Sequence, residues 1–392
     1  MDCISDRTWA EINLDHLAHN YSRVVELAAQ GNPQQPAKVM SVIKANAYGH
    51  GAVQAARILT GAGCEYMAVA TIDEAIELRQ SGIKARILVL NHIDPLRCED
   101  VLEYDVTQTV YSDDFARNLS RKAVLAKKRA RIHIKVDTGM TRIGIDSQEA
   151  ADTILRIAQM QGLEVEGLFT HFASSDDPQD PFTVLQFNRF MELSDSLKKG
   201  GLEIPLKHVC NSAAIIEHPE MHLDMVRPGI VLYGYYPSEE VRKISIKPIM
   251  TFKTKVNRVN MVRPDTGISY GRIYRTGKNA RIITMPVGYA DGYCRLLTGK
   301  ARVLVNGMSA PVVGKICMDQ CMADVTEVSG DIRVGDEVVL WGEQGGKSVF
   351  ADEIARLIGT ISYEVLCNVS RRVPRYYLAS NRIIDSINYI RE

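Results

Sequence analysis

The chain has 392 residues, enough for two or three domains and at least one large buried core. Its 47 lysine and arginine residues balance 47 aspartate and glutamate residues, so no overall charge attracts nucleic acid or an anionic membrane. With 46% apolar and 24% charged residues, the composition is that of a globular protein and excludes a disordered chain. We therefore expect a small-molecule partner bound at a local site, and neither nucleic acid nor a membrane.

The start of the chain and its cysteines predict a cytoplasmic protein. Residues 1–9 contain Asp2 and Asp6 and lack the apolar stretch of a signal peptide, and no later segment has the apolar length to span a bilayer. The eight cysteines are dispersed without a Cys-x-x-Cys pair, which favours reduced thiols. They are Cys3, Cys64, Cys98, Cys210, Cys294, Cys317, Cys321 and Cys367.

Residues 38–233 alternate short β-branched runs with longer amphipathic segments, the pattern of repeated βα units. Eight such runs predict a closed (β/α)8 barrel. The expected strands are Lys38 to Ile43, Glu65 to Ala70, Arg86 to Leu90, Val106 to Val110, Arg131 to Val136, Val165 to Thr170, Leu206 to Cys210 and Leu223 to Arg227. Helices are expected between them, for example over 51–60 and 146–161, and another over 15–29 precedes the first strand.

After residue 240 the sequence changes to short Val, Ile and Thr runs separated by Gly and Pro, which predicts a mainly β domain. The expected strands are 249–260, 280–287, 301–305, 310–317, 321–326 and 335–340, followed by a short helix over 352–358. We place the boundary after residue 242, so that an α/β barrel over 1–242 precedes a mainly β domain over 243–392.

Polar residues follow several predicted barrel strands, at the end where such barrels carry out chemistry. They are Lys44, Lys135 to Asp137, His171, Asn211-Ser212 and Arg227. A lysine directly after Val42-Ile43 is costly to desolvate, and a neutral amine there suits Schiff-base chemistry. The alternative is a lysine that reaches solvent at the rim of the barrel.

The loops after strands 7 and 8 resemble a phosphate site. They read Asn211-Ser212-Ala213-Ala214 and Arg227-Pro228-Gly229-Ile230, and barrels often bind phosphate at this position. A plain helix cap at Ser212 and a turn at Gly229 would explain each loop equally well. Together with Lys44, the loops favour a phosphorylated carbonyl cofactor, of which pyridoxal phosphate is the common example.

These residues lie in segments that resemble the alanine racemases, members of the fold type III pyridoxal-phosphate enzymes. In the first domain the matching segments are Lys44-Ala45-Asn46-Ala47-Tyr48-Gly49-His50-Gly51, Lys135 to Gly144, Thr170-His171-Phe172-Ala173, Asn211 to Ala214 and Val226 to Ile230. In the second they are Ile268-Ser269-Tyr270-Gly271, Gly288 to Gly292, Cys317-Met318-Asp319-Gln320 and Tyr363 to Cys367. The resemblance covers nearly the whole chain and implies racemisation of L- and D-alanine, which supplies D-alanine for peptidoglycan.

The resemblance also implies how pyridoxal phosphate is held. Lys44 would bind it covalently, and Arg227 would face its pyridine nitrogen. A guanidinium cannot accept a proton, so it disfavours a protonated ring and favours exchange at Cα over transamination. The remaining cofactor-binding residues would be Tyr48, His171, Asn211, Ser212, Gly229, Ile230 and Tyr363.

For catalysis, the resemblance implies two bases, Lys44 and Tyr270, one for each face of the substrate. His171 would link Arg227 to Tyr270, and Tyr270 would reach the active site of a partner subunit, which makes the active form a homodimer with shared sites.

For the substrate, the resemblance implies that Arg142 and the Met318 N–H bind the carboxylate and that Tyr289 lines the entrance. Lys135 occupies a position that is often carbamylated in the family, and Asp319 would support the site from outside.

Three other functions are weighed against this one. A fold type III decarboxylase of basic amino acids would share the barrel, the lysine and the β domain, but decarboxylation benefits from an acid at the pyridine nitrogen, and Arg227 counts against it. A protein that only carries pyridoxal phosphate would need neither the second domain nor the Tyr270 segment. A racemase of broader specificity would share most of these motifs.

Three further features have simple structural explanations. Cys317 and Cys321 are four residues apart without an accompanying histidine or second thiol pair, so we expect no metal site. The basic run from Arg121 to Arg131 is interpreted as a solvated helix face that leads into strand 5. Gly342 to Gly346 is expected to be a turn, because it lacks the spacing of a dinucleotide-binding loop.

Overall fold

The structure is a computed structural model that describes residues 7–391. Residues 1–6 and Glu392 lie outside the described residues. The first group includes Cys3 and most of the 1–9 stretch in which no signal peptide is predicted. The chain divides into two compact units. The barrel unit comprises Leu17–Ala47 and Ala52–Lys247, and the β unit comprises the residues up to His16, Tyr48–Gly51 and the residues from Pro248 onward. This division differs from a single cut after residue 242, because two early segments join the later domain.

The barrel unit is built on eight parallel strands in the order β10-β2-β3-β4-β5-β6-β8-β9. They are β2 (Lys38–Val42), β3 (Tyr66–Val69), β4 (Arg86–Val89), β5 (Thr107–Val110), β6 (Ala130–Asp137), β8 (Leu163–Phe169), β9 (Leu206–His208) and β10 (Met225–Val226), and β7 (Ile145–Asp146) is added beside β6. Backbone hydrogen bonds from Asp224 to Lys207 (3.1 Å) and from Arg227 to Cys210 (3.0 Å) join the last two strands. The barrel is thus nearly closed, as predicted.

Each predicted barrel strand is present, but β10 is shorter than the expected Leu223 to Arg227. Leu223 has a φ of 51° and therefore lies outside the extended region. Pro228 has no N–H to continue the ladder beyond Arg227. The strand is consequently limited to two residues, and Arg227 lies just past its carboxyl end.

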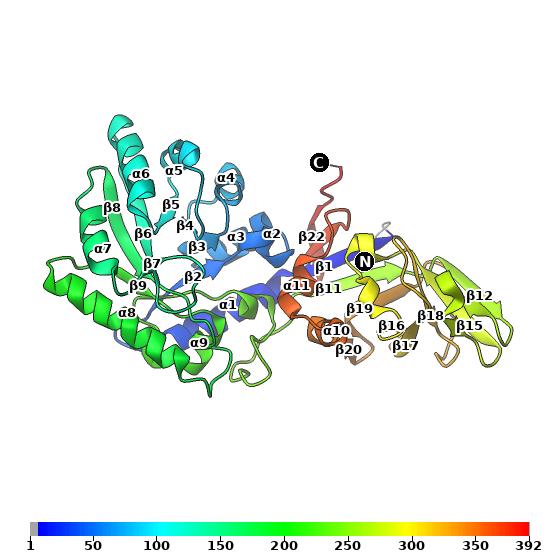
Figure 1. The fold of residues 1–392 in the computed structure, drawn as a ribbon. Coiled ribbons are helices and arrows are strands. Elements are labelled where there is room, and N and C mark those ends of the chain that lie inside the picture. The colour runs from blue at the N-terminus through cyan, green and yellow to red at the C-terminus, as the bar shows by residue number, and fades with distance from the viewer. Residues whose placement is uncertain (1–6, 392) are drawn as a thin grey trace. The chain divides into compact units, whose positions relative to one another are not determined.

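Helices surround the strands of the barrel unit (Figure 1). They are α1 (Leu14–Ala28), α3 (Ala52–Gly61), α4 (Ile72–Gln80), α5 (Cys98–Glu103), α6 (Asp113–Leu125), α7 (Ala150–Ala158), α8 (Phe182–Lys199) and α9 (Ser212–Glu217). Helix α1 begins at the end of the first β-unit segment. Short 3₁₀ turns span Pro95–Arg97, Pro219–Met221 and Ile230–Tyr233. Side-chain caps fix several starts: Thr71 accepts from Glu74 N–H at α4 and Ser112 from Phe115 N–H at α6. Buried residues such as Phe115 and Leu119 recur at helical spacing and face the core.

The β unit contains a large sheet in the order β12-β15-β18-β17-β16-β19-β11-β1-β21-β22, with β20 beside β19. Its strands are β1 (Thr8–Asn13), β11 (Met250–Lys255), β12 (Arg258–Val262), β15 (Ala280–Met285), β16 (Arg302–Val305), β17 (Met308–Val313), β18 (Cys321–Asp324), β19 (Glu337–Gln344), β20 (Lys347–Val349), β21 (Arg375–Ala379) and β22 (Arg382–Ile387). A small hairpin joins β13 (Gly267–Ile268) and β14 (Tyr274–Arg275). This architecture confirms the mainly β second domain.

Helices α10 (Ala351–Ile358) and α11 (Ser362–Cys367) and 3₁₀ turns at Tyr270–Arg272, Tyr289–Asp291 and Arg295–Leu297 complete the β unit. The first described strand, β1, pairs antiparallel with β11 and parallel with β21, with Thr8 opposite Thr254 and Ala10 opposite Arg375. Phe252 and Trp341 are fully buried with ring centroids 4.5 Å apart and form part of the core. Within residues 7–391, the helices are all too short or too polar to span a bilayer.

Candidate active site

Lys44 follows β2 at the start of an unusual left-handed turn. Ala45, Asn46, Ala47 and Tyr48 all have φ between 52° and 54°. Each non-glycine residue in this region costs roughly 1–2 kcal/mol, so the turn persists only because its surroundings hold it. Strain of this kind next to a half-buried lysine is typical of a functional site.

Glu74 is one of the groups that hold the turn. Its Oε1 accepts the N–H of Ala45 at 2.6 Å, and its Oε2 accepts the N–H groups of Ala70 (2.7 Å) and Thr71 (3.2 Å). The carboxylate thereby connects the end of β3 to the residue after Lys44. Our sequence analysis did not select Glu74, although the capping-box spacing of Thr71 and Glu74 directly after a strand is a readable signal.

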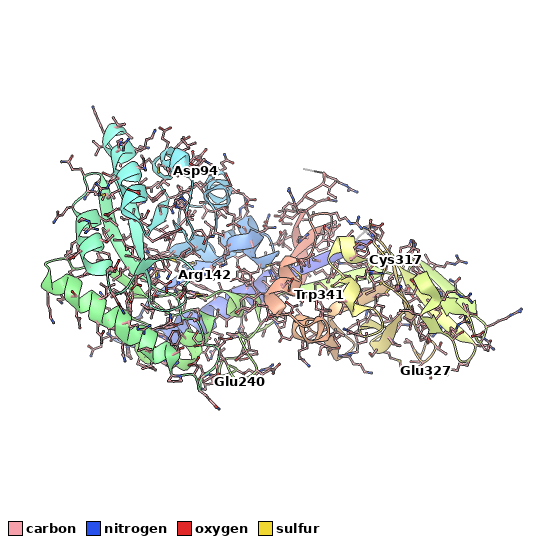
Figure 2. The ribbon with its side chains drawn as sticks, viewed as in Figure 1. Asp94, Arg142, Glu240, Cys317, Glu327 and Trp341 are labelled. Carbon is pink, nitrogen blue, oxygen red and sulfur yellow. The ribbon has the colours of Figure 1, made fainter. Side chains whose placement is uncertain are left out.

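Five basic side chains influence one another in the barrel unit. His171 is half-buried, and loss of solvation lowers its pKa well below the usual value, helped by the charges of four neighbours. Those neighbours, largest effect first, are Arg227, Arg142, Lys135 and Lys44. The barrel unit therefore brings together four predicted strand-end residues and Arg142, the predicted carboxylate-binding residue, which Figure 2 shows within this unit. Such a concentration of basic groups fits anionic ligands, for example a phosphate or a carboxylate.

Arg227 is buried and donates to several neutral acceptors. Its Nη2 donates to the carbonyls of Thr170 (2.7 Å) and Val209 (2.9 Å) and lies 3.3 Å from Nδ1 of His171. Its Nη1 donates to the carbonyl and to Nδ1 of His208, both at 2.8 Å. Burial lowers the pKa of Arg227 to about 10, so the guanidinium stays charged near neutrality.

Beyond Arg227, a hydrogen-bonded chain runs through two buried histidines to a carboxylate. Nε2 of His208 lies 2.8 Å from Nδ1 of His133, and Nε2 of His133 lies 3.3 Å from Oε2 of Glu166. Because a guanidinium only donates, Nδ1 of His208 must accept, and the proton of His208 is therefore on Nε2. This Nε2 donates to Nδ1 of His133, so the proton of His133 is also on Nε2. Burial lowers the pKa of both histidines, which favours these neutral forms. The other carboxylate oxygen of Glu166, Oε1, pairs with Nη1 of Arg86 at 2.5 Å.

Lys135 lies on β6 and is buried. Its Nζ donates to the carbonyl of Val136 at 2.7 Å and lies 5.5 Å from the ring centroid of Phe169. Burial, with a further contribution from the charge of Arg227, lowers the pKa of Lys135 to about 7. A large share of this amine is therefore neutral near pH 7, the form in which it acts as a nucleophile.

The two predicted phosphate loops meet in the barrel unit. Ser212 Oγ accepts the N–H of Gly229 at 2.9 Å, and Ile230 begins the 3₁₀ turn that follows. Asn211 caps α9 through its side-chain oxygen, which accepts the N–H groups of Ala213 and Ala214 at 3.1 Å each. The helix cap is therefore Asn211 and not the expected Ser212, while Gly229 directly precedes a 3₁₀ turn. The loops still present a hydroxyl and backbone amides beside the basic cluster, a donor set that fits a phosphate.

Two predicted cofactor residues lie together in the β unit. The rings of Tyr48 and Tyr363 have centroids 5.9 Å apart. The buried Arg375 donates to the Gly49 carbonyl at 3.2 Å and to the Val369 carbonyl at 2.7 Å. This guanidinium therefore ties the segment of Tyr48 to the end of α11, which carries Tyr363.

The other predicted residues of the β unit are exposed. Tyr270 is 72% exposed, Met318 52% and Tyr289 42%. An open groove of about 720 Å³ runs beside Tyr270, and Ser269 and Cys317 are among its lining residues. Figure 2 shows Cys317 in this unit. The strained φ of 63° at Ser269 directly precedes Tyr270.

Comparison with known proteins decides the family. The alanine racemase N-terminal domain matches residues 12–237, and the alanine racemase C-terminal domain matches residues 249–377. The chain belongs to the alanine racemase family. It is 44% identical over 385 residues to the alanine racemase of Clostridium novyi, and the match covers 97% of this chain and 98% of the Clostridium novyi protein. It is 45% identical over 393 residues to the alanine racemase of Clostridium perfringens ATCC 13124, and that match covers 100% of both chains.

Solved structures of alanine racemases also match. The enzyme of Clostridium difficile 630 superposes with a TM-score of 0.93 at 42% identity, over 99% of this chain and 100% of that one. The Bacillus anthracis alanine racemase with bound L-Ala-P superposes with a TM-score of 0.91 at 35% identity, over 99% of both chains. The resemblance seen in the sequence is confirmed, and racemisation is favoured over the decarboxylase and carrier alternatives.

Proposed function

We propose that this protein interconverts L-alanine and D-alanine with pyridoxal phosphate as cofactor, in the cytoplasm, and so supplies D-alanine for peptidoglycan synthesis. The observation that carries the proposal is the set of basic residues around His171 in a chain of the alanine racemase family. A phosphorylated cofactor and a substrate carboxylate are anions that this set of basic residues would bind.

For the cofactor, we propose that Lys44 forms the covalent attachment and that Arg227 faces the pyridine nitrogen. When bound, pyridoxal phosphate would acidify the Cα proton of an attached amino acid by delocalising negative charge. Arg227 would keep its own proton and donate, which limits that delocalisation and favours return of a proton to Cα. The phosphate and ring would be held by Tyr48, His171, Asn211, Ser212, Gly229, Ile230 and Tyr363.

For proton transfer, we propose that Lys44 serves one face of Cα and Tyr270 the other. His171 would connect Tyr270 to Arg227. Because Tyr270 is 72% exposed beside an open groove, a second copy of the chain is the natural partner to cover it. The active form would then be a homodimer in which each site takes Lys44 from one subunit and Tyr270 from the other.

For the substrate, we propose that Arg142 and the backbone N–H of Met318 bind the carboxylate and that Tyr289 lines the entrance. Lys135 would be carbamylated: its neutral amine would bond the carbon of CO₂ and release a proton, giving an anion that orients Arg142. Incubation with ¹³C-bicarbonate should give a carbamate carbon signal in the wild type that Lys135→Met lacks. A wild type without this signal would contradict the carbamylation.

The activity is tested by incubating the purified protein with L-alanine, L-serine and L-lysine separately and assaying the chirality of each product. Racemisation of alanine above the other two is expected. Release of CO₂ from lysine would instead indicate a decarboxylase, and no turnover with bound cofactor would indicate a carrier. Borohydride should fix the cofactor to Lys44, and fixation on another lysine would contradict the assignment.

The shared sites are tested by mixing two inactive variants, Lys44→Ala and Tyr270→Phe. Each mixed dimer should contain one site with both bases intact and should regain activity. Tyr270→Phe alone should retain cofactor absorption, because the phenol is not proposed to hold the cofactor. No recovery after demonstrated subunit exchange would refute the shared-site proposal.

A further inference from the structure

Two neighbouring segments of the β unit carry the residues proposed to meet the substrate. Tyr289 lies in residues 288–292 and Met318 in residues 317–320. Tyr289 N–H donates to the Cys317 carbonyl at 3.1 Å, and Ala290 N–H donates to the Met318 carbonyl at 3.0 Å. A Cβ on Gly288 would lie 2.2 Å from the Cys317 oxygen, so the segments are in direct backbone contact.

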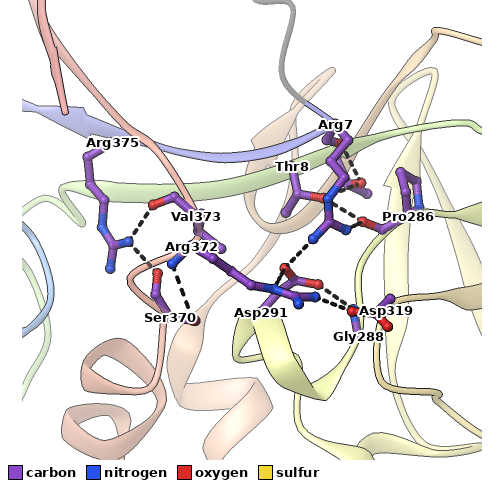
Figure 3. Close-up of polar contacts among 11 residues, drawn as sticks. Arg7, Thr8, Pro286, Gly288, Asp291, Asp319, Ser370, Arg372, Val373 and Arg375 are labelled. Atoms are coloured by element: carbon purple, nitrogen blue, oxygen red, sulfur yellow. Dashed lines mark hydrogen bonds and ion pairs between the residues drawn. The ribbon is translucent and has the colours of Figure 1, made fainter. Parts of the chain in front are cut away.

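Asp291 is the buried centre of this contact. Its Oδ2 accepts the N–H of Gly288 at 2.9 Å. Its Oδ1 accepts from Nη2 of Arg7 and from Nε of Arg372, both at 2.8 Å (Figure 3). A buried carboxylate is costly unless it is paired and hydrogen-bonded, and Asp291 has both kinds of partner.

The two arginines extend this centre to both segments. Nη2 of Arg372 donates to Asp319, the residue after Met318, at 2.5 Å. Arg7 also donates to the carbonyl of Pro286, two residues before Gly288 (Figure 3). The planar fork of Arg372 therefore bridges Asp291 and Asp319 and fixes the distance between their segments.

We propose that Asp291 is a positioning residue for substrate binding: with Arg7 and Arg372, it fixes the Tyr289 side chain relative to the Met318 backbone N–H. The proposal rests on the proposed function for the roles of Tyr289 and Met318. These two residues are 42% and 52% exposed, so core packing alone does not place them. A 1 Å displacement of such groups can cost about a hundredfold in rate.

The test is Asp291→Asn, measured in the apoprotein and in the cofactor-loaded enzyme. The side chains of Arg7 and Arg372 are 43% and 28% exposed, so water can solvate them when the carboxylate is removed. We expect at least tenfold faster amide hydrogen exchange in residues 288–292 and 317–320. We also expect a KM for alanine raised about tenfold, a kcat within threefold of wild type and unchanged cofactor absorption.

The matched control is Glu353→Gln, which removes a carboxylate from a comparable ion pair in the same unit. Glu353 binds Arg302 through both oxygens, at 2.8 and 2.6 Å, and this ion pair includes no residue of either segment. The control should leave exchange in both segments and the KM within twofold of wild type. A second variant, Arg372→Lys, keeps the charge but loses the fork, and it should raise exchange in residues 317–320 and the KM even if Asp291→Asn fails to fold.

Unchanged exchange and KM in Asp291→Asn, or equal effects in Glu353→Gln, would overturn the proposal. So would an Arg372→Lys protein that behaves as wild type. If the wild type does not racemise alanine, the proposed function fails. The exchange comparison needs no substrate and still decides whether Asp291 fixes the two segments.

Discussion

Nη1 of Arg227 donates to Nδ1 of His208 at 2.8 Å, and this one contact fixes the proton positions on two buried rings. Because the guanidinium cannot accept, every donor in the chain from Arg227 through His208 and His133 points toward Glu166. The carboxylate of Glu166 is thus connected to the buried cation without touching it.

His208→Phe tests this connection. Phenylalanine keeps the ring stacked on Phe169, whose centroid lies 4.8 Å away, but it removes the acceptor for Arg227 and the donor to His133. Each unpaired buried group costs about 1–3 kcal/mol. We expect a lower melting temperature, at least tenfold lower kcat/KM and an altered cofactor absorption spectrum.

His222→Phe is the control, because His222 is also buried in the barrel unit but its ring bonds the Ile215 carbonyl, at 2.9 Å, and the backbone of Ala28, both outside the chain from Arg227 to Glu166. It should lower stability while the activity of the folded protein stays within threefold of wild type. Equal losses of activity in the two variants would show that the chain has no specific effect on Arg227.

Glu74→Ala removes the carboxylate that accepts the N–H groups of Ala45, Ala70 and Thr71. The strained turn after Lys44 then loses one of its restraints. We expect the free energy of unfolding to fall by about 1–3 kcal/mol. We also expect pyridoxal phosphate to attach more slowly when it is added to the apoprotein, measured as the change in absorbance with time. Thr71→Ala loses only the cap on Glu74 N–H, so attachment at the wild-type rate in both variants would contradict the role of Glu74.

Lys135 makes stability depend on pH. Its pKa falls from 10.5 in the unfolded chain to about 7 in the folded protein, so the unfolded state binds more protons between these values. The free energy of unfolding should therefore rise as pH increases from about 7 to 10.5. Lys135→Met should be more stable than wild type at pH 7 in CO₂-free buffer, and the difference should shrink toward pH 10.5. A constant difference in urea unfolding across this range would contradict the lowered pKa.

Arg375→Lys tests whether the buried guanidinium organises the proposed phosphate tyrosines. Arg375 donates to the carbonyls of Gly49, Val369, Ser370 and Val373, and an ammonium cannot serve all four in this geometry. We expect a Kd for pyridoxal phosphate at least tenfold weaker, measured by fluorescence titration. Arg302→Lys, at an ion pair elsewhere in the β unit, should leave this Kd within twofold.

Much of the fold follows from local sequence patterns. The eight β-branched runs become the barrel strands, because fully buried parallel strands require continuous apolar sequence. The β1 strand was not predicted, because it pairs with the distant strand β11. Thr8 of β1 lies opposite Thr254, 246 residues along the chain, and no local pattern reveals this pairing. The left-handed turn after Lys44 was missed for a related reason: alanine favours a right-handed helix, and only tertiary contacts such as that from Glu74 impose the other hand.

The candidate site divides in the same way. Lys44, Lys135, His171 and Arg227 could be selected because they directly follow or end apolar runs. His133 and His208 could not, because a histidine inside a strand is usually a satisfied core residue and their contact joins positions 75 residues apart. Asp291 was noticed only within a motif, because its partners Arg7 and Arg372 come from opposite ends of the chain.

The position of β1 between β11 and β21 has a consequence for how the chain is made. On the ribosome β1 is synthesised before the barrel, yet its neighbours, residues 250–255 and 375–379, emerge only after the whole barrel sequence. A fragment truncated before β21 would leave β1 with an unpaired edge, and a fragment that begins at Pro248 would lack an interior strand of its sheet. Exposed strand edges of this kind promote aggregation. Separate expression of the β unit should therefore succeed only when residues 7–16 are restored, for example by fusion ahead of residue 248.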